Sequence, residues 1–110
     1  MKRHEEYPVN REAVLNRKPT HPGDWFTEDI LPHLGRRTIS EMATLMGISR
    51  QHLHGVMSGE RSITADMAVR LGKLCGNGAE IWLGLQARYD AWEARRRLAK
   101  ELKKIPSLSD

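Results

Sequence analysis

The sequence predicts an all-helical domain built from five helices. Three observations carry this prediction: apolar residues recur every three or four positions, glycines stand where these runs stop, and no segment alternates as a strand would. With 110 residues, the chain is expected to form one domain. We expect an N-terminal arm over residues 1–20, the helical domain over 21–103 with a long C-terminal helix, and a flexible tail over 104–110.

The first two helices are marked by their terminal residues. The first begins at His21-Pro22-Gly23, because proline suits a first helical turn, and Pro32 should bend or end it. Thr38 and Glu41 have the spacing of a capping box, so the second helix starts there and ends at Gly47.

Cap residues also mark the last three helices. Ser49 precedes a helix from Arg50 to about Met57, and Thr64 precedes a fourth helix that reaches Cys75. After a Gly-Asn-Gly break, the fifth helix is expected over about 79–103.

The second and third helices are joined by only Gly47-Ile48-Ser49. Gly47 can adopt the left-handed backbone that a tight turn requires, and Ala43 is small where the two helices must approach. Two short amphipathic helices joined in this way form a helix-turn-helix arrangement.

The third helix has one apolar face and one polar face. Helical spacing places Leu53, Val56 and Met57 towards the core. The exposed side is then predicted to carry Arg50, Gln51, His52, His54, Gly55 and Ser58. In a helix-turn-helix this side enters the major groove, where arginine can pair with guanine and glutamine with adenine.

The hydroxyls at the helix starts suit a different part of DNA. Thr38 and Ser49 stand where backbone N–H groups point outwards, which favours phosphate. Gly55 on the outward face would allow DNA to approach closely, although neutral variation at an exposed site explains it equally well.

The same segment does not predict a metal or catalytic site. His52 and His54 are two positions apart and therefore point about 160° away from each other on a helix, whereas a helical metal pair needs a spacing of three or four. We find no nucleophile paired with a base and no phosphate-binding loop. The sequence thus predicts no cofactor, no metal and no enzymatic activity.

Charge and composition leave the partner open but indicate the compartment. The net charge of +4 comes from basic ends, since residues 21–75 carry six basic and six acidic residues. Basic ends are typical of a protein that binds nucleic acid, but charged ends that are simply solvated would explain the balance equally well. A single cysteine, Cys75, and the absence of a long apolar run predict a cytoplasmic protein without a membrane segment.

An apolar stripe on the fifth helix predicts a dimer. Leu85, Tyr89 and Trp92 extend beyond what a four-helix core needs, and a two-fold dimer would match two half-sites on DNA. The alternative is that these residues pack on the first and fourth helices of the same chain.

Three segments resemble the HigA-type antitoxins, within the lambda-repressor-like helix-turn-helix class. They are "KPTHPGDW" at 18–25, "ISEMATLMGISRQHLHGVMSGERSITADMAVRLGKL" at 39–74 and "AEIWLGLQARYDAW" at 79–92, and together they cover most of residues 18–92. The last is the most specific, because general helix-turn-helix proteins lack this tryptophan-rich helix.

The resemblance implies a dimeric protein that represses its own operon and neutralises a HigB-type toxin, an mRNA endonuclease related to RelE. It implies contacts to bases from Arg50, Gln51 and His54, and contacts to phosphate from Thr38, Ser49 and Arg61. Two alternatives stay open: a stand-alone regulator without a toxin, and an inhibitor that binds only protein.

Overall fold

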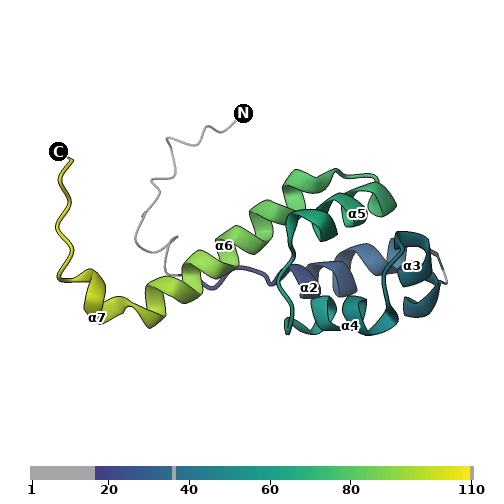
Figure 1. Cartoon of the computed structure of the whole chain (residues 1–110), viewed down its shortest axis with the longest axis horizontal. Coiled ribbons are helices and arrows are strands. Elements are labelled where there is room, and N and C mark those ends of the chain that lie inside the picture. Colours follow the sequence, from purple (N-terminus) through teal and green to yellow (C-terminus); the bar gives the residue numbers. More distant parts are fainter. Residues whose placement is uncertain (1–16, 36, 110) are drawn as a thin grey trace, which may run out of the picture.

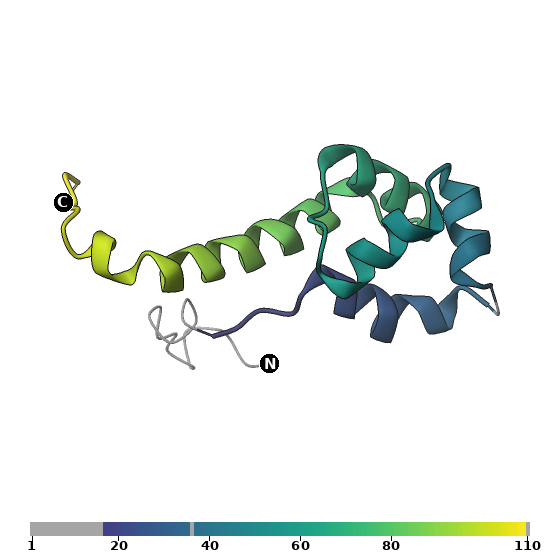
Figure 2. The same ribbon diagram turned by 60° about the horizontal axis from the view of Figure 1, so that its bottom comes forward.

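All regular elements that the computed structural model describes, over residues 17–35 and 37–109, are helical, which confirms the predicted fold class. The α-helices are α2 (Pro22–Trp25), α3 (Ile39–Met46), α4 (Arg50–Ser58), α5 (Ala65–Cys75), α6 (Ala79–Arg97) and α7 (Ala99–Leu102). In Figure 1, α2 to α5 form the body of the molecule, and α6 runs out of it towards α7 and the C-terminal end. Figure 2 shows the same projection from another side.

The predicted first helix is not one regular α-helix. After α2 the backbone widens into a π-helical turn, η2 (Phe26–Ile30), and then tightens into a 3-10 turn, η3 (Leu31–His33). Pro32 lies in η3, has no N–H to donate, and its ring would clash with the carbonyl four residues earlier in a regular α-helix. The helical run ends at His33, one residue after Pro32, so the prediction that Pro32 bends or ends this helix is confirmed in its second form.

The helices α3, α4 and α5 begin at the predicted caps. The side chains of Thr38, Ser49 and Thr64 each accept a hydrogen bond from the backbone N–H three residues further on. A left-handed glycine follows each helix, and Gly47 with a φ of 74° is the one that makes the turn between α3 and α4.

The predicted fifth helix is too long. It stops at Arg97, where Leu98 leaves helical geometry with φ −100° and ψ 16°, and the separate short helix α7 follows. This break lies on the part of α6 that projects from the body formed by α2 to α5, and a helix that does not pack on that body has only its own marginal stability.

Trp82 joins α6 to the body. Its side chain is fully buried, its ring centroid lies 4.8 Å from that of Trp25 and 6.1 Å from that of Phe26, and its indole N–H donates to the side-chain oxygen of Asn77 at 3.0 Å. The buried core around it comprises Phe26, Met42, Ala43, Met46, Leu53, Val56, Ile63, Met67, Ala68 and Leu71.

A close contact between α2 and the end of α4 requires a residue without a side chain. A Cβ atom at Gly23 would lie 2.3 Å from the carbonyl oxygen of Met57 and 2.6 Å from that of Val56. Both are backbone atoms that cannot move aside without shifting a helix.

We expect Gly23→Ala to lower the free energy of unfolding by about 2 kcal/mol or more, because the new methyl group must push α2 away from α4. Gly84→Ala is the matched control, because Gly84 lies within the helix α6 and a Cβ atom there would have no neighbouring atom within 4 Å. The control should gain about 0.5–1 kcal/mol from helix propensity. Urea unfolding of both variants measures this, and equal effects would contradict the close contact.

Candidate DNA-binding surface

The turn between α3 and α4 is held by backbone and side-chain hydrogen bonds. The N–H of Ile48 donates to the carbonyl of Ala43 at 3.0 Å, which closes the chain around Gly47. Arg70 of α5 donates from its guanidinium to the carbonyl of Met46 at 2.5 Å, so the C-terminal end of α3 is capped from a neighbouring helix. The direction of α4 relative to α3 is fixed by these contacts.

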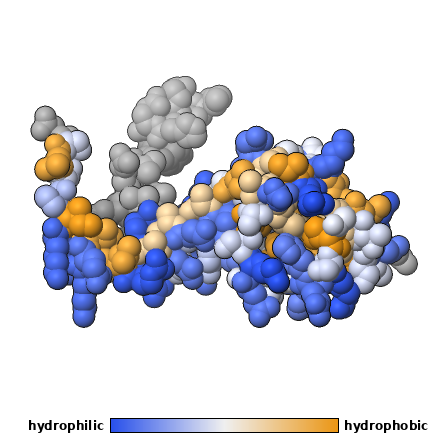
Figure 3. All heavy atoms as spheres, viewed as in Figure 1, coloured by the Kyte–Doolittle hydropathy of each residue, from blue (hydrophilic) through white to orange (hydrophobic). Residues whose placement is uncertain are grey.

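The two-faced character predicted for α4 is confirmed. Leu53 and Val56 are buried, while Arg50, Gln51 and His54 are exposed and His52 is half-buried. Figure 3 shows hydrophilic residues along the lower edge of the body, where α4 lies in Figure 1. The exposed side of α4 carries the side chains that the sequence predicts to contact bases.

The two predicted phosphate sites differ in charge. At the start of α3, the carboxylate of Glu41 accepts the N–H of Thr38 at 2.8 Å, so a negative group already occupies this helix terminus. At the start of α4, Ser49 accepts the N–H of His52 at 3.0 Å, and the first turn contains no acidic residue. Since like charges repel, the Ser49 terminus suits phosphate better than the Thr38 terminus.

The prediction that Gly55 lies open on the exposed face is wrong. Gly55 is buried, because the chain after α4 turns back and lays the side chain of Arg61 over it. The N–H of Arg61 donates to the carbonyl of Gly55 at 3.0 Å, and a Cβ at Gly55 would lie 2.9 Å from Cδ of Arg61. Gly55 therefore makes room for Arg61 and offers no open surface to DNA.

Arg61 itself is exposed, as a phosphate contact must be. Ser58 at the end of α4 is also exposed, but its hydroxyl faces the carbonyl of Gly55 at 3.2 Å and the carboxylate of Glu60 at 3.3 Å. A DNA contact by Ser58 would compete with these two local acceptors.

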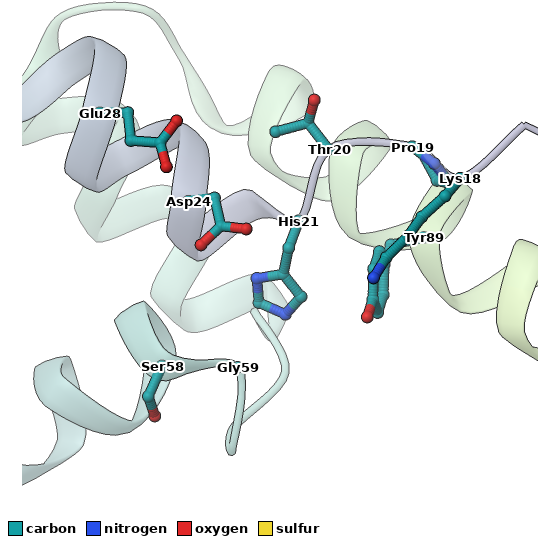
Figure 4. Close-up of a pocket in the computed structure, with 9 residues that line it drawn as sticks. All are labelled: Lys18, Pro19, Thr20, His21, Asp24, Glu28, Ser58, Gly59 and Tyr89. Atoms are coloured by element: carbon teal, nitrogen blue, oxygen red, sulfur yellow. The ribbon is translucent and has the colours of Figure 1, made fainter.

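His21, expected only to mark the start of the first helix, has two further structural contacts. Its Nδ1 accepts the N–H of Gly23 at 2.9 Å and so caps α2, while its ring stands edge-on to Tyr89 of α6 at 4.7 Å. Figure 4 shows the ring between the Ser58–Gly59 end of α4 and Tyr89. A recess of about 460 Å³ surrounds it, lined by Lys18, Pro19, Thr20, His21, Asp24, Glu28, Ser58, Gly59 and Tyr89.

The three residues predicted for the dimer interface are partly engaged within the chain. Tyr89 contacts His21, and Trp92 is only 8% exposed, with the Lys18 ammonium 5.7 Å and the Arg96 guanidinium 4.9 Å from its ring centroid. Leu85 is half-buried. A partner would thus meet Leu85 and the edges of the two aromatic residues rather than a fully exposed stripe.

Among the described residues, no group of three or more histidine, cysteine or acidic side chains is placed to hold a metal ion. Burial raises the pKa of Cys75, the one cysteine of the chain, which keeps the thiol protonated at neutral pH. Within the same residues, no helix has both the length and the apolar character needed to cross a membrane.

Two capped helices across a glycine turn, the second with a polar outer face, define the class of the helix-turn-helix proteins.

No family model matches the chain. It is 34% identical over 96 residues to an uncharacterized HTH-type transcriptional regulator, YbaQ, of Escherichia coli K12, covering 86% of this chain and 84% of that protein. It is 30% identical over 92 residues to antitoxin HigA-1 of Vibrio cholerae, covering 84% and 86%. The chain belongs to the HigA family of helix-turn-helix antitoxins and regulators, which are not enzymes.

The fold also matches a solved member of this family. The antitoxin HigA of Pseudomonas aeruginosa, whose structure was determined with the higBA promoter, superposes with a TM-score of 0.76 at 27% sequence identity. The match covers 83% of this chain and 99% of that one.

We expect the capping box of α3 to make stability depend on pH. The hydrogen bond from the Thr38 backbone N–H, followed by that with the Thr38 hydroxyl, lowers the pKa of Glu41 below its ordinary value. A group with a lowered pKa stabilises the fold above its unfolded-state pKa and loses this contribution as the pH falls through its folded-state pKa. The stability advantage over Glu41→Gln should therefore be largest near neutral pH and shrink on acidification. Melting temperatures of both proteins measured against pH check this, and a constant difference would contradict it.

Proposed function

We propose that this protein is a transcriptional regulator of the antitoxin type, which binds operator DNA through the exposed face of α4. The observation that carries this proposal is the position of Arg50, Gln51 and His54 on the exposed face of a helix whose other face is buried. The structure of the P. aeruginosa HigA with its promoter supports promoter DNA as the ligand.

The residues divide into two roles in this proposal. Arg50 and Gln51 contact base edges, since they lie in the first turn of α4, with His54 one turn further on. Ser49 and Arg61 bind phosphates on either side of that face, and Thr38 makes a weaker contact because Glu41 occupies its terminus. His52 and Ser58 lie at the margins of this surface. Gly55 makes no contact with DNA in this proposal, because it is buried.

We also infer that the protein acts as a cytoplasmic homodimer that represses its own operon and neutralises a HigB- or RelE-like mRNA endonuclease by direct contact. The similarity to antitoxin HigA-1 of V. cholerae supports this. The alternative is a stand-alone regulator without a toxin, which the similarity to the transcriptional regulator YbaQ favours. A small basic toxin-like reading frame next to this gene would favour the antitoxin, and its absence would favour the regulator.

The double variant Arg50→Ala/Gln51→Ala should lose specific DNA binding without losing its fold. Two bidentate base contacts are worth about 2–6 kcal/mol together, so the affinity for the chain's own promoter fragment should approach that for unrelated DNA. Fluorescence anisotropy gives the affinities, and circular dichroism checks the helical content. Arg88→Ala, which removes an exposed arginine from α6, is the control. Unchanged specific binding by the double variant would refute the role of α4.

The proposed dimer is tested at Leu85, which is half-buried in the single chain. Leu85→Arg should convert the dimer into a monomer. In a two-fold dimer each substitution occurs twice, so two like charges would be brought together in an apolar contact. Ala87→Arg places the same charge on an exposed position of the same helix and should leave the dimer intact. Sedimentation velocity measures both masses, and a dimer that survives Leu85→Arg would exclude this interface.

A further inference from the structure

A buried amide ties α6 to the residues that follow α4. Gln86 is 5% exposed, and its side-chain oxygen accepts the backbone N–H of Ile63 at 2.8 Å. Its side-chain nitrogen donates to the carboxylate of Asp90 at 2.9 Å. The role assigned to α6 in dimer formation does not require either hydrogen bond.

The residues held in this way carry Arg61. We name the stretch from Gly59 to Ile63 the return segment, because it leads the chain back across the outer face of α4. At one end Ile63 is buried at 4% exposure and hydrogen-bonded to Gln86. At the other end Gly59 lies beside the ring of His21, where a Cβ atom would lie 3.0 Å from Nε2. Between them, Arg61 donates its N–H to the carbonyl of Gly55.

Asp90 determines which way the amide of Gln86 faces. A carboxylate can only accept hydrogen bonds, so the side-chain nitrogen of Gln86 must turn towards Asp90. The side-chain oxygen is then left facing the N–H of Ile63, which needs an acceptor because it is buried. Without Asp90 the amide could flip and present a donor to another donor.

We propose that Gln86 is a positioning residue for DNA binding, which acts by holding the return segment so that Arg61 stays on the surface of α4, with Asp90 as the residue that orients it. This inference rests on the proposed function and adds a residue that faces away from the DNA. It links α6, the helix assigned to the dimer, to a phosphate contact on the recognition surface.

The test compares Gln86→Met with Arg61→Ala in the full chain, using a DNA duplex selected by the wild-type protein from a random-sequence pool. Gln86→Met keeps the length of the side chain and removes both hydrogen bonds. Loss of one phosphate contact per protomer should reduce the slope of log affinity against log salt by about one per protomer, and therefore by about two for the proposed homodimer, in either variant. The double variant should show no further reduction, because both changes remove the same contact. Asp90→Leu removes the acceptor that orients Gln86 and should reduce the slope in the same direction as Gln86→Met.

A second measurement separates positioning from general stability. Hydrogen exchange is measured on the backbone amides. In Gln86→Met the amide hydrogen of Ile63 should exchange with solvent faster than in the wild type, while the amide hydrogen of Leu53 in α4 should exchange at the wild-type rate. Asn77→Ala is the matched control, because it removes a hydrogen bond from the buried Trp82 without touching the return segment. Its stability should fall while its salt slope stays that of the wild type.

The outcomes separate this inference from the proposed function. If the wild type selects no duplex, both fail. If the wild type binds and Gln86→Met keeps the wild-type salt slope, only the role of Gln86 fails. The role also fails if Asn77→Ala reduces the slope equally, or if Gln86→Met and Arg61→Ala act additively.

Discussion

The inner face of α6 is the constraint on which the rest of the described structure depends. Trp82, Gln86 and Tyr89 follow one another at spacings of four and three, so they share one side of the helix. Trp82 closes the core against Trp25 and Phe26, Gln86 holds the backbone at Ile63, and Tyr89 supports the histidine that caps α2. Successive turns of one helix thus fix three separate parts of the body, including the segment beside the recognition surface.

This arrangement limits what α6 can offer to a partner. Tyr89 contacts His21 and Trp92 is buried at 8% exposure, whereas Leu85 is half-buried, so the stripe inferred from spacing combines residues of different roles. Among the described residues, α6 also exposes Ile81 at 43% and Leu83 at 38%, which the spacing argument passed over. A partner on α6 would therefore bind close to residues that position the DNA-binding surface, which couples the two surfaces through a shared helix.

Local features could be predicted from the sequence, and features that depend on distant contacts could not. The caps at Thr38, Ser49 and Thr64 and the turn at Gly47 rest on hydrogen bonds within a few residues, and all were found where expected. Gly55 was misplaced because helical spacing cannot show that Arg61 returns over it. The contact of His21 with Tyr89 and that of Gln86 with Ile63 were missed because they join residues far apart in the chain. The cap that His21 forms with Gly23 is local, and a glutamine on the face of a buried tryptophan was also a usable signal.

The charge distribution explains why such positioning matters for a protein of this kind. Residues 21–75, which contain the whole helix-turn-helix, carry as many acidic as basic residues, so their net charge adds no overall attraction to DNA. In the proposed complex, electrostatic attraction comes from a few points: Arg50, Arg61 and the N-terminus of α4, which lacks acidic residues in its first turn. When binding depends on so few contacts, each of them must be held in place. Binding two half-sites together also gives a higher affinity than binding either half-site alone. Anchoring of the return segment by α6 and the proposed assembly into a dimer through the same helix would both meet this requirement.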